Sequence, residues 1–249
     1  MDSKGPSIKS GGSHVSRGPT FRVDSGLFSS SAHDTTCAQF TPLHYEPDYG
    51  YPLIVWLHGH CDDERQLLRV MPLVSMRNYV AVAPRGPRIR GKEQAKSFGY
   101  GWGQSQRDTV QAEQRIFDAI DAAVEKFNIA ADRVFLAGFD CGGTMAFRIA
   151  MHNPDRFAGV LSLCGRFPSG RAPLGNITEA RHLPVLLAVG RDSSRYSPDE
   201  ACEDLRLFHS AGVSVALRQY PCGQELTPQM LADLDRWIIE QIRSPETSL

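Results

Sequence analysis

The chain has 249 residues, of which 41% are hydrophobic and 22% charged, with 27 basic and 28 acidic side chains. These values exclude an intrinsically disordered protein and an overall polybasic nucleic-acid binder, and no apolar run reaches the roughly 18 residues of a membrane span. Six cysteines without a Cys-x-x-Cys pair, and a Gly- and Ser-rich beginning without a secretory signal, lead us to expect a cytoplasmic protein with reduced thiols.

Residues 1–33 are rich in Ser and Gly and have no hydrophobic periodicity, so we expect a flexible tail. Residues 34–249 are then a single domain in which strands and helices alternate. The predicted strands are apolar on both faces and each ends at a turn signal, which is typical of a parallel sheet covered by helices on both sides. They are residues 52–57, 79–83, 133–137, 159–163, 184–189 and 213–220.

The segments between these strands have the apolar spacing of helices that pack on a sheet. Asp108 and Gln111 predict a capping box at the start of one helix, whose buried face we expect to include Ile120 and Val124. Further helices are predicted at residues 143–151, 198–209 and 228–242.

Repeated strand–helix units imply right-handed crossovers, which bring the carboxyl ends of the parallel strands to one edge of the sheet. Ligands bind at this edge in open α/β sheets. We therefore expect functional residues directly after the strands, at residues 58–61, 84–90, 138–143, 164–170, 190–196 and 221–226.

A nucleophile elbow is predicted where the strand at 133–137 runs into Gly138-Phe-Asp-Cys-Gly-Gly143 and then a helix. In this turn the central residue, Asp140, has a positive φ, and the residues two before and two after it must be small. We also expect Asp140 to face Gln224 across the crevice. A glycine-rich turn without any chemistry is the alternative interpretation.

Residues Leu136 to Phe147 closely resemble the elbow of the phospholipase/carboxylesterase family of α/β-hydrolases, which reads Gly-Phe-Ser-Gln-Gly-Gly. Leu57-His-Gly59 resembles the oxyanion-loop motif of that family, and residues 220–226 resemble the stretch that carries its Gly-His-Glu motif. The resemblance covers roughly residues 36–243. It implies an α/β-hydrolase fold, with a mostly parallel central sheet of about eight strands flanked by helices, a Ser-His-Asp triad, and hydrolysis of carboxylic esters or thioesters.

The chain departs from the family pattern at the catalytic positions. Asp140 stands at the serine position and Gln224 at the histidine position. The family register places Ser193 at the acid position, with Asp192 one residue early, and Asp192 could serve if the loop shifts. The resemblance also implies an oxyanion hole formed by the backbone N–H groups of His60 and Cys141.

These substitutions predict an impaired esterase. Attack by the Asp140 carboxylate on an ester would give an anhydride, and its charge would repel an oxyanion at the helix N-terminus. Gln224 cannot take up a proton at neutral pH, so the general base is missing as well. Loss of one triad member costs on the order of 10⁴- to 10⁶-fold in rate.

Two unorthodox catalytic sites remain open. Cys141 could be the nucleophile, but that register would place the bulky Phe139 two residues before it. Asp140 could act as in haloalkane-dehalogenase-like members of the fold, with His60 activating the water that releases the product. The remaining interpretations are a non-enzymatic protein that binds a small ester-like or anionic ligand, and a structural or interaction protein.

Two further segments lie near the predicted crevice. Residues 85–96 form a basic loop that could attract an anion or simply be solvated, and residues 98–103 form an aromatic pocket wall or pack their Trp102 in the core. We expect no cofactor, because no Walker or dinucleotide fingerprint is present, and no metal, because the histidines lack ligand spacing.

Overall fold

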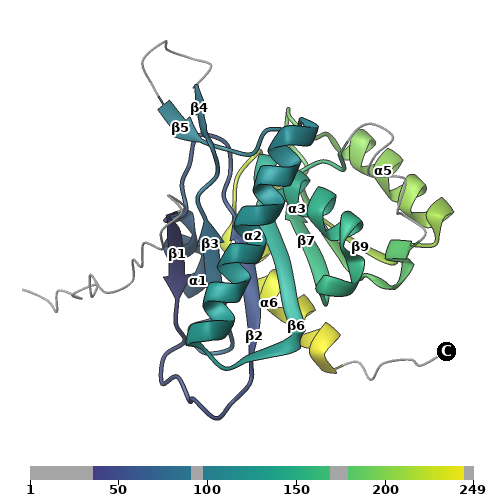
Figure 1. The fold of residues 1–249 in the computed structure, drawn as a ribbon. Coiled ribbons are helices and arrows are strands. Elements are labelled where there is room, and N and C mark those ends of the chain that lie inside the picture. Colours follow the sequence, from purple (N-terminus) through teal and green to yellow (C-terminus); the bar gives the residue numbers. More distant parts are fainter. Residues whose placement is uncertain (1–35, 91–97, 169–178, 244–249) are drawn as a thin grey trace, which may run out of the picture.

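A seven-stranded sheet in the order β1-β3-β2-β6-β7-β8-β9 forms the centre of the molecule (Figure 1). The computed structural model describes residues 36–90, 98–168 and 179–243. β1 pairs with β3 antiparallel, and the other neighbours in the sheet are parallel. The strands of the sheet are β1 (Cys37–Phe40), β2 (Tyr51–Leu57), β3 (Val80–Pro84), β6 (Ile129–Phe139), β7 (Gly159–Leu163), β8 (Val185–Gly190) and β9 (Val215–Tyr220).

This sheet confirms the mostly parallel α/β architecture, and the six predicted strands are all present. About eight strands were expected, whereas seven belong to the sheet in the described part of the chain. β4 (Arg88–Arg90) and β5 (Phe98–Tyr100) form a separate antiparallel pair that was not predicted (Figure 1).

Helices cover both faces of the sheet because each face is apolar. One hydrophobic cluster joins α1 and α6 to one face, and a second cluster joins α2, α3 and α5 to the other (Figure 1). The α-helices are α1 (Gln66–Val74), α2 (Gln106–Lys126), α3 (Cys141–His152), α5 (Pro198–Ala211) and α6 (Pro228–Arg243), with 3-10 turns η2 (Pro154–Arg156) and η3 (Glu179–His182).

The start of α2 differs from the prediction. Ser105, not Asp108, is the N-cap: its hydroxyl accepts from the backbone N–H of Asp108, whose carboxylate accepts from the N–H of Ser105. Asp108 is therefore the third residue of the helix and the second member of the capping box. The predicted buried position of Val124 is also wrong, since this side chain is 53% exposed, whereas Ile120 is buried.

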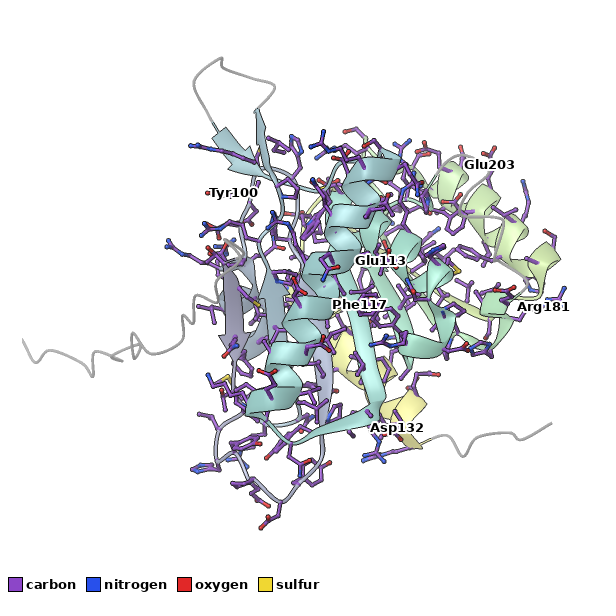
Figure 2. The ribbon with its side chains drawn as sticks, in the orientation of Figure 1. Tyr100, Glu113, Phe117, Asp132, Arg181 and Glu203 are labelled. Atoms are coloured by element: carbon purple, nitrogen blue, oxygen red, sulfur yellow. The ribbon has the colours of Figure 1, made fainter. Side chains whose placement is uncertain are left out.

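The carboxyl ends of the parallel strands lie at one end of the molecule. Figure 2 shows Asp132, near the start of β6, at the end opposite Tyr100 and Glu203. The residues that follow β6, β7, β8 and β9 meet at the carboxyl end of the sheet, where hydrogen bonds join them. The tail predicted at residues 1–33 lies outside the described residues, so its boundary with the single domain stays a prediction.

Candidate functional site

The turn between β6 and α3 has the predicted elbow geometry. Asp140 has φ 52° and ψ −120° and lies directly before α3. A Cβ on Gly142 would overlap the carbonyl oxygens of Leu57 and His58, and a Cβ on Gly138 would lie 2.5 Å from the backbone of Gly142. Glycine is therefore required on both sides of Asp140 because β2, β6 and α3 approach each other closely there.

The Asp140 carboxylate accepts hydrogen bonds from three donors. Its Oδ1 accepts from Gln224 Nε2 at 3.1 Å, and its Oδ2 accepts from the backbone N–H of His60 at 3.4 Å and from Arg195 Nη1 at 3.1 Å. The side chain of Asp140 is only 12% exposed. The contact between Asp140 and Gln224 confirms the expected facing pair. The His60 amide, expected to stabilise an oxyanion, is directed at this carboxylate, and Cys141 is the first residue of α3.

Gln224 joins Asp140 to Ser193. The Ser193 hydroxyl donates to Gln224 Oε1 at 2.7 Å, and Gln224 Nε2 donates to Asp140 and, at 2.8 Å, to the carbonyl oxygen of Cys164. In a Ser-His-Asp triad the middle residue donates to the acid and accepts from the nucleophile. Here the middle residue accepts from position 193 and donates to position 140, so the direction of hydrogen bonding is reversed.

Ser193, and not the side chain of Asp192, is the residue that the structure brings to Gln224. Ser193 is buried, whereas the Asp192 side chain is 63% exposed and lies 3.6 Å from Arg191 Nε. Ser193 Oγ also accepts from the backbone N–H groups of Arg195 and Tyr196, each at 3.2 Å. These bonds shape the loop after β8 and place Arg195 beside Asp140.

A second carboxylate, Asp204 on α5, supports the wall next to this loop. Its Oδ2 accepts from the Tyr196 hydroxyl at 2.7 Å and from the backbone N–H of Phe167 at 3.1 Å. Burial raises the pKa of Asp204, and burial, with the bond to Asp204, raises the pKa of Tyr196. The two groups therefore hold each other and the Phe167 backbone in place.

The Cys141 thiol is protonated at neutral pH. Burial raises its pKa to about 11, and the Asp140 charge acts in the same direction. A thiol needs its thiolate form to attack a carbonyl. The environment of Cys141 therefore does not activate it, although the residue lines the pocket described below.

The oxyanion-loop histidine, His58, has a structural environment. It is fully buried, its Nε2 accepts from the backbone N–H of Gly86 at 3.0 Å, and its Nδ1 lies 2.9 Å from the carbonyl oxygen of Gly59. Burial lowers the pKa of His58 and keeps it neutral. Trp102 is buried and donates to the His58 carbonyl oxygen at 3.1 Å, so of its two predicted roles the structure shows core packing.

Arg85, the first residue of the basic segment, differs from the expectation of a solvated or anion-attracting side chain. Arg85 donates through Nε and Nη2 to the two carboxylate oxygens of Glu64, each at 2.6 Å. Glu64 is fully buried. Arg85 therefore joins the loop after β3 to the loop after β2, and residues 91–97 of the basic segment lie outside the described residues.

A pocket of about 300 Å³ opens beside Asp140 at the carboxyl end of the sheet. Its lining includes Gln224 and three arginines that the sequence analysis did not identify: Arg148, Arg166 and Arg195. Arg166 and Arg195 follow β7 and β8, inside segments where functional residues were expected. Position alone could have drawn attention to them, whereas Arg148 on α3 has no such signal.

Other kinds of site find no support in the described part of the chain. Residues 36–90, 98–168 and 179–243 contain no group of three or more His, Cys, Asp and Glu side chains arranged to hold a metal ion. Within the same residues, no helix combines the length and the apolar character needed to cross a bilayer.

Two curated proteins share part of this sequence. NocK of Nocardia uniformis subsp. tsuyamanensis, provisionally named an esterase, is 28% identical over 150 residues, which are 57% of this chain and 40% of NocK. Epoxide hydrolase B of Mycobacterium tuberculosis is 30% identical over 130 residues, which are 52% of this chain and 33% of that protein. The chain thus matches less than half the length of these relatives.

Solved structures share the fold over most of their length. A carboxylesterase from Mesorhizobium loti superposes with a TM-score of 0.68 at 16% identity, covering 86% of this chain and 99% of that one. Arabidopsis thaliana SOBER1 gives 0.68 at 18% identity, with 78% and 100% covered, and Zea mays acyl-protein thioesterase 2 gives 0.63 at 18%, with 83% and 98% covered. These likenesses show the α/β-hydrolase fold.

The family assignment comes from the sequence itself. Residues 49–241 match the family model of the phospholipase/carboxylesterase group, and this range includes β2, the elbow at Asp140 and the residue Gln224. The chain therefore belongs to the phospholipase/carboxylesterase family of α/β-hydrolases.

Proposed function

We propose that this family member binds a small molecule in the pocket beside Asp140 without hydrolysing esters. The observation that carries this proposal is the set of partners of the Asp140 carboxylate. All three are donors, namely a backbone amide, the amide of Gln224 and the guanidinium of Arg195. None of these groups can accept a proton at neutral pH.

Two requirements of ester hydrolysis are not met, namely an activated nucleophile and a general base. A carboxylate that is tied to a guanidinium and two N–H groups is a weak nucleophile, and Gln224 cannot activate either a nucleophile or a water molecule. The amide of His60, which would stabilise an oxyanion, already donates to Asp140. A developing oxyanion would meet a resident negative charge, which opposes the transition state.

The first test is an activity screen of the wild-type protein. We expect turnover at background on p-nitrophenyl esters of short and long chain and on the corresponding thioesters. Styrene oxide belongs in the same screen, because one relative is named an epoxide hydrolase and Asp140 could attack an epoxide carbon. Turnover above background that disappears in Asp140→Asn, which tolerates a positive φ, would overturn the proposal.

The second test restores the triad. The double variant Asp140→Ser/Gln224→His supplies a nucleophile and a base, and the triple variant adds Ser193→Asp, because Ser193 contacts Gln224 in this structure. We expect the triple variant to gain esterase activity well above the double variant, since the orienting acid is worth up to about 10⁴-fold.

Asp192→Asn in the triple background is the matched control. We expect no loss there, because the Asp192 side chain is exposed and lies near Arg191. If the triple variant keeps its thermal melt but stays at background, the substitutions at positions 140, 193 and 224 do not account for the absence of ester hydrolysis, and the argument from the missing triad is wrong.

A further inference from the structure

The pocket beside Asp140 is rich in positive charge. Among the described residues, its lining carries three guanidinium groups and one carboxylate, that of Asp140. The arginines come from three different elements: Arg148 from α3, Arg166 from the loop after β7, and Arg195 from the loop after β8. They line the same pocket as Asp140 and Cys141 at the N-terminus of α3, where the helix dipole adds to the positive potential.

Each guanidinium is oriented by a neighbouring acceptor. Arg148 Nε donates to Gln104 Oε1 at 2.7 Å, and burial lowers the pKa of Arg148. Arg166 donates through Nη2 to the carbonyl oxygen of Arg195 and lies 3.4 Å through Nη1 from Glu200 Oε1. Side chains held in this way lose little further freedom when an anion binds between them.

The wall of the pocket is apolar and firmly supported. Phe167 lies 5.5 Å from Phe147 and 4.7 Å from Phe208, measured between ring centroids, in edge-to-face contacts. Its backbone N–H is bound by Asp204, which also accepts from the Tyr196 hydroxyl. Phe167 and Tyr196 therefore offer a fixed surface for a small hydrocarbon body next to the arginines.

We infer that this pocket binds a small organic carboxylate: its anionic group lies among the three arginines and its short apolar or aromatic body against Phe167 and Tyr196. The inference rests on the proposed function and adds the ligand class. An ester is neutral at its carbonyl group, whereas the corresponding acid is an anion that guanidinium groups bind through two parallel hydrogen bonds. The volume of about 300 Å³ is at the lower limit of small-molecule sites, so the ligand is small.

The test compares an acid with its ester in isothermal titration calorimetry of the full chain. The probes are benzoate, methyl benzoate and inorganic phosphate. We expect benzoate to bind at millimolar concentration or below, with an affinity that falls as salt rises, and methyl benzoate to bind at least about tenfold more weakly. Phosphate has the charge without the apolar body, so it should also bind more weakly than benzoate.

Variants assign the binding to the pocket. Arg166→Met and Arg148→Met should each weaken benzoate binding by about tenfold or more, because each removes a charged hydrogen-bond donor. Arg69→Met is the matched control, since Arg69 is 61% exposed, pairs with Asp62 and is not part of the pocket lining. Asp140→Asn should strengthen benzoate binding by up to about tenfold, because the negative charge of Asp140 is removed from the lining.

Four results would overturn the inference: no benzoate binding at millimolar concentration, equal binding of methyl benzoate, equal binding of phosphate, or unchanged binding by both arginine variants with normal thermal melts. A failure of the proposed function would be detected by a different measurement. Ester turnover by the wild-type protein that disappears in Asp140→Asn would overturn that proposal through the activity screen, whatever the calorimetry of benzoate shows.

Discussion

Two arginine–carboxylate pairs lie in loops that follow the strands at the carboxyl end of the sheet, and they differ in burial and geometry. Arg85 donates hydrogen bonds to both carboxylate oxygens of Glu64, each at 2.6 Å, and the Glu64 side chain is fully buried. Arg195 meets one oxygen of Asp140 at 3.1 Å, and its own side chain is 53% exposed. The first pair joins two loops of the scaffold, whereas the second leaves its guanidinium at the edge of a pocket.

This difference teaches that the same two functional groups serve different purposes at one end of the sheet. A buried, bidentate pair is costly to break because the remaining charge is left without a partner in a low-dielectric interior. A pair whose guanidinium is half exposed and makes a single contact is partly screened by water and contributes less to folding. Charges of the second kind can be shared with a ligand.

The largest expected effect comes from breaking the buried pair. Arg85→Ala leaves the Glu64 carboxylate buried without its partner, and we expect a loss of about 3 kcal/mol in the free energy of unfolding. Chemical denaturation measures it. Arg69→Ala removes an exposed partner of Asp62 and should cost about 1 kcal/mol or less. Equal losses in the two variants would contradict the structural role of the Arg85–Glu64 pair.

A smaller effect is expected at the residue that shapes the loop of the second pair. Ser193→Ala removes the hydroxyl that binds the half-buried Gln224 side-chain carbonyl and the N–H groups of Arg195 and Tyr196. We expect it to lower the free energy of unfolding by about 2 kcal/mol. Ser210→Ala is the control, because its exposed hydroxyl only donates to the carbonyl of Leu207 within α5. A thermal melt of Ser193→Ala like that of the control would show that Ser193 does not hold the loop.

The smallest effect on stability is expected for the open pair. Arg195→Ala should lower the free energy of unfolding by about 1 kcal/mol or less, because the guanidinium is half exposed. The same variant should weaken benzoate binding, since the lining loses one of its three cations. A loss of stability as large as that of Arg85→Ala, measured by the same denaturation, would erase the distinction between the two pairs.

The elbow could be predicted from sequence because backbone contacts dictate it. Gly138 and Gly142 stand where a side chain would strike neighbouring backbone, and Asp140 carries the positive φ that such a turn needs. The strands could be predicted for a related reason, since burial on both faces demands continuous apolar runs. These constraints are local and are visible in a short stretch of residues.

The parts that could not be predicted depend on contacts between distant residues or on weak local signals. α1 contains Pro72, which normally ends a helix. The arginines of the pocket resemble ordinary surface cations in the sequence. The loop that brings Arg195 to Asp140 is held by Ser193, which accepts from the Arg195 N–H, and the contact between Ser193 and Gln224 spans 31 positions.

The hydrogen bonds of Gln224 make it a cross-link between four strand ends. The residue follows β9, and its single amide binds Asp140 after β6, the Cys164 carbonyl after β7 and Ser193 after β8. A triad histidine at this position would take up and release a proton during each turnover, whereas the uncharged amide keeps the same hydrogen bonds. The rim of the pocket is thus held together by hydrogen bonds before any ligand binds. A preorganised pocket loses less conformational entropy when a ligand binds.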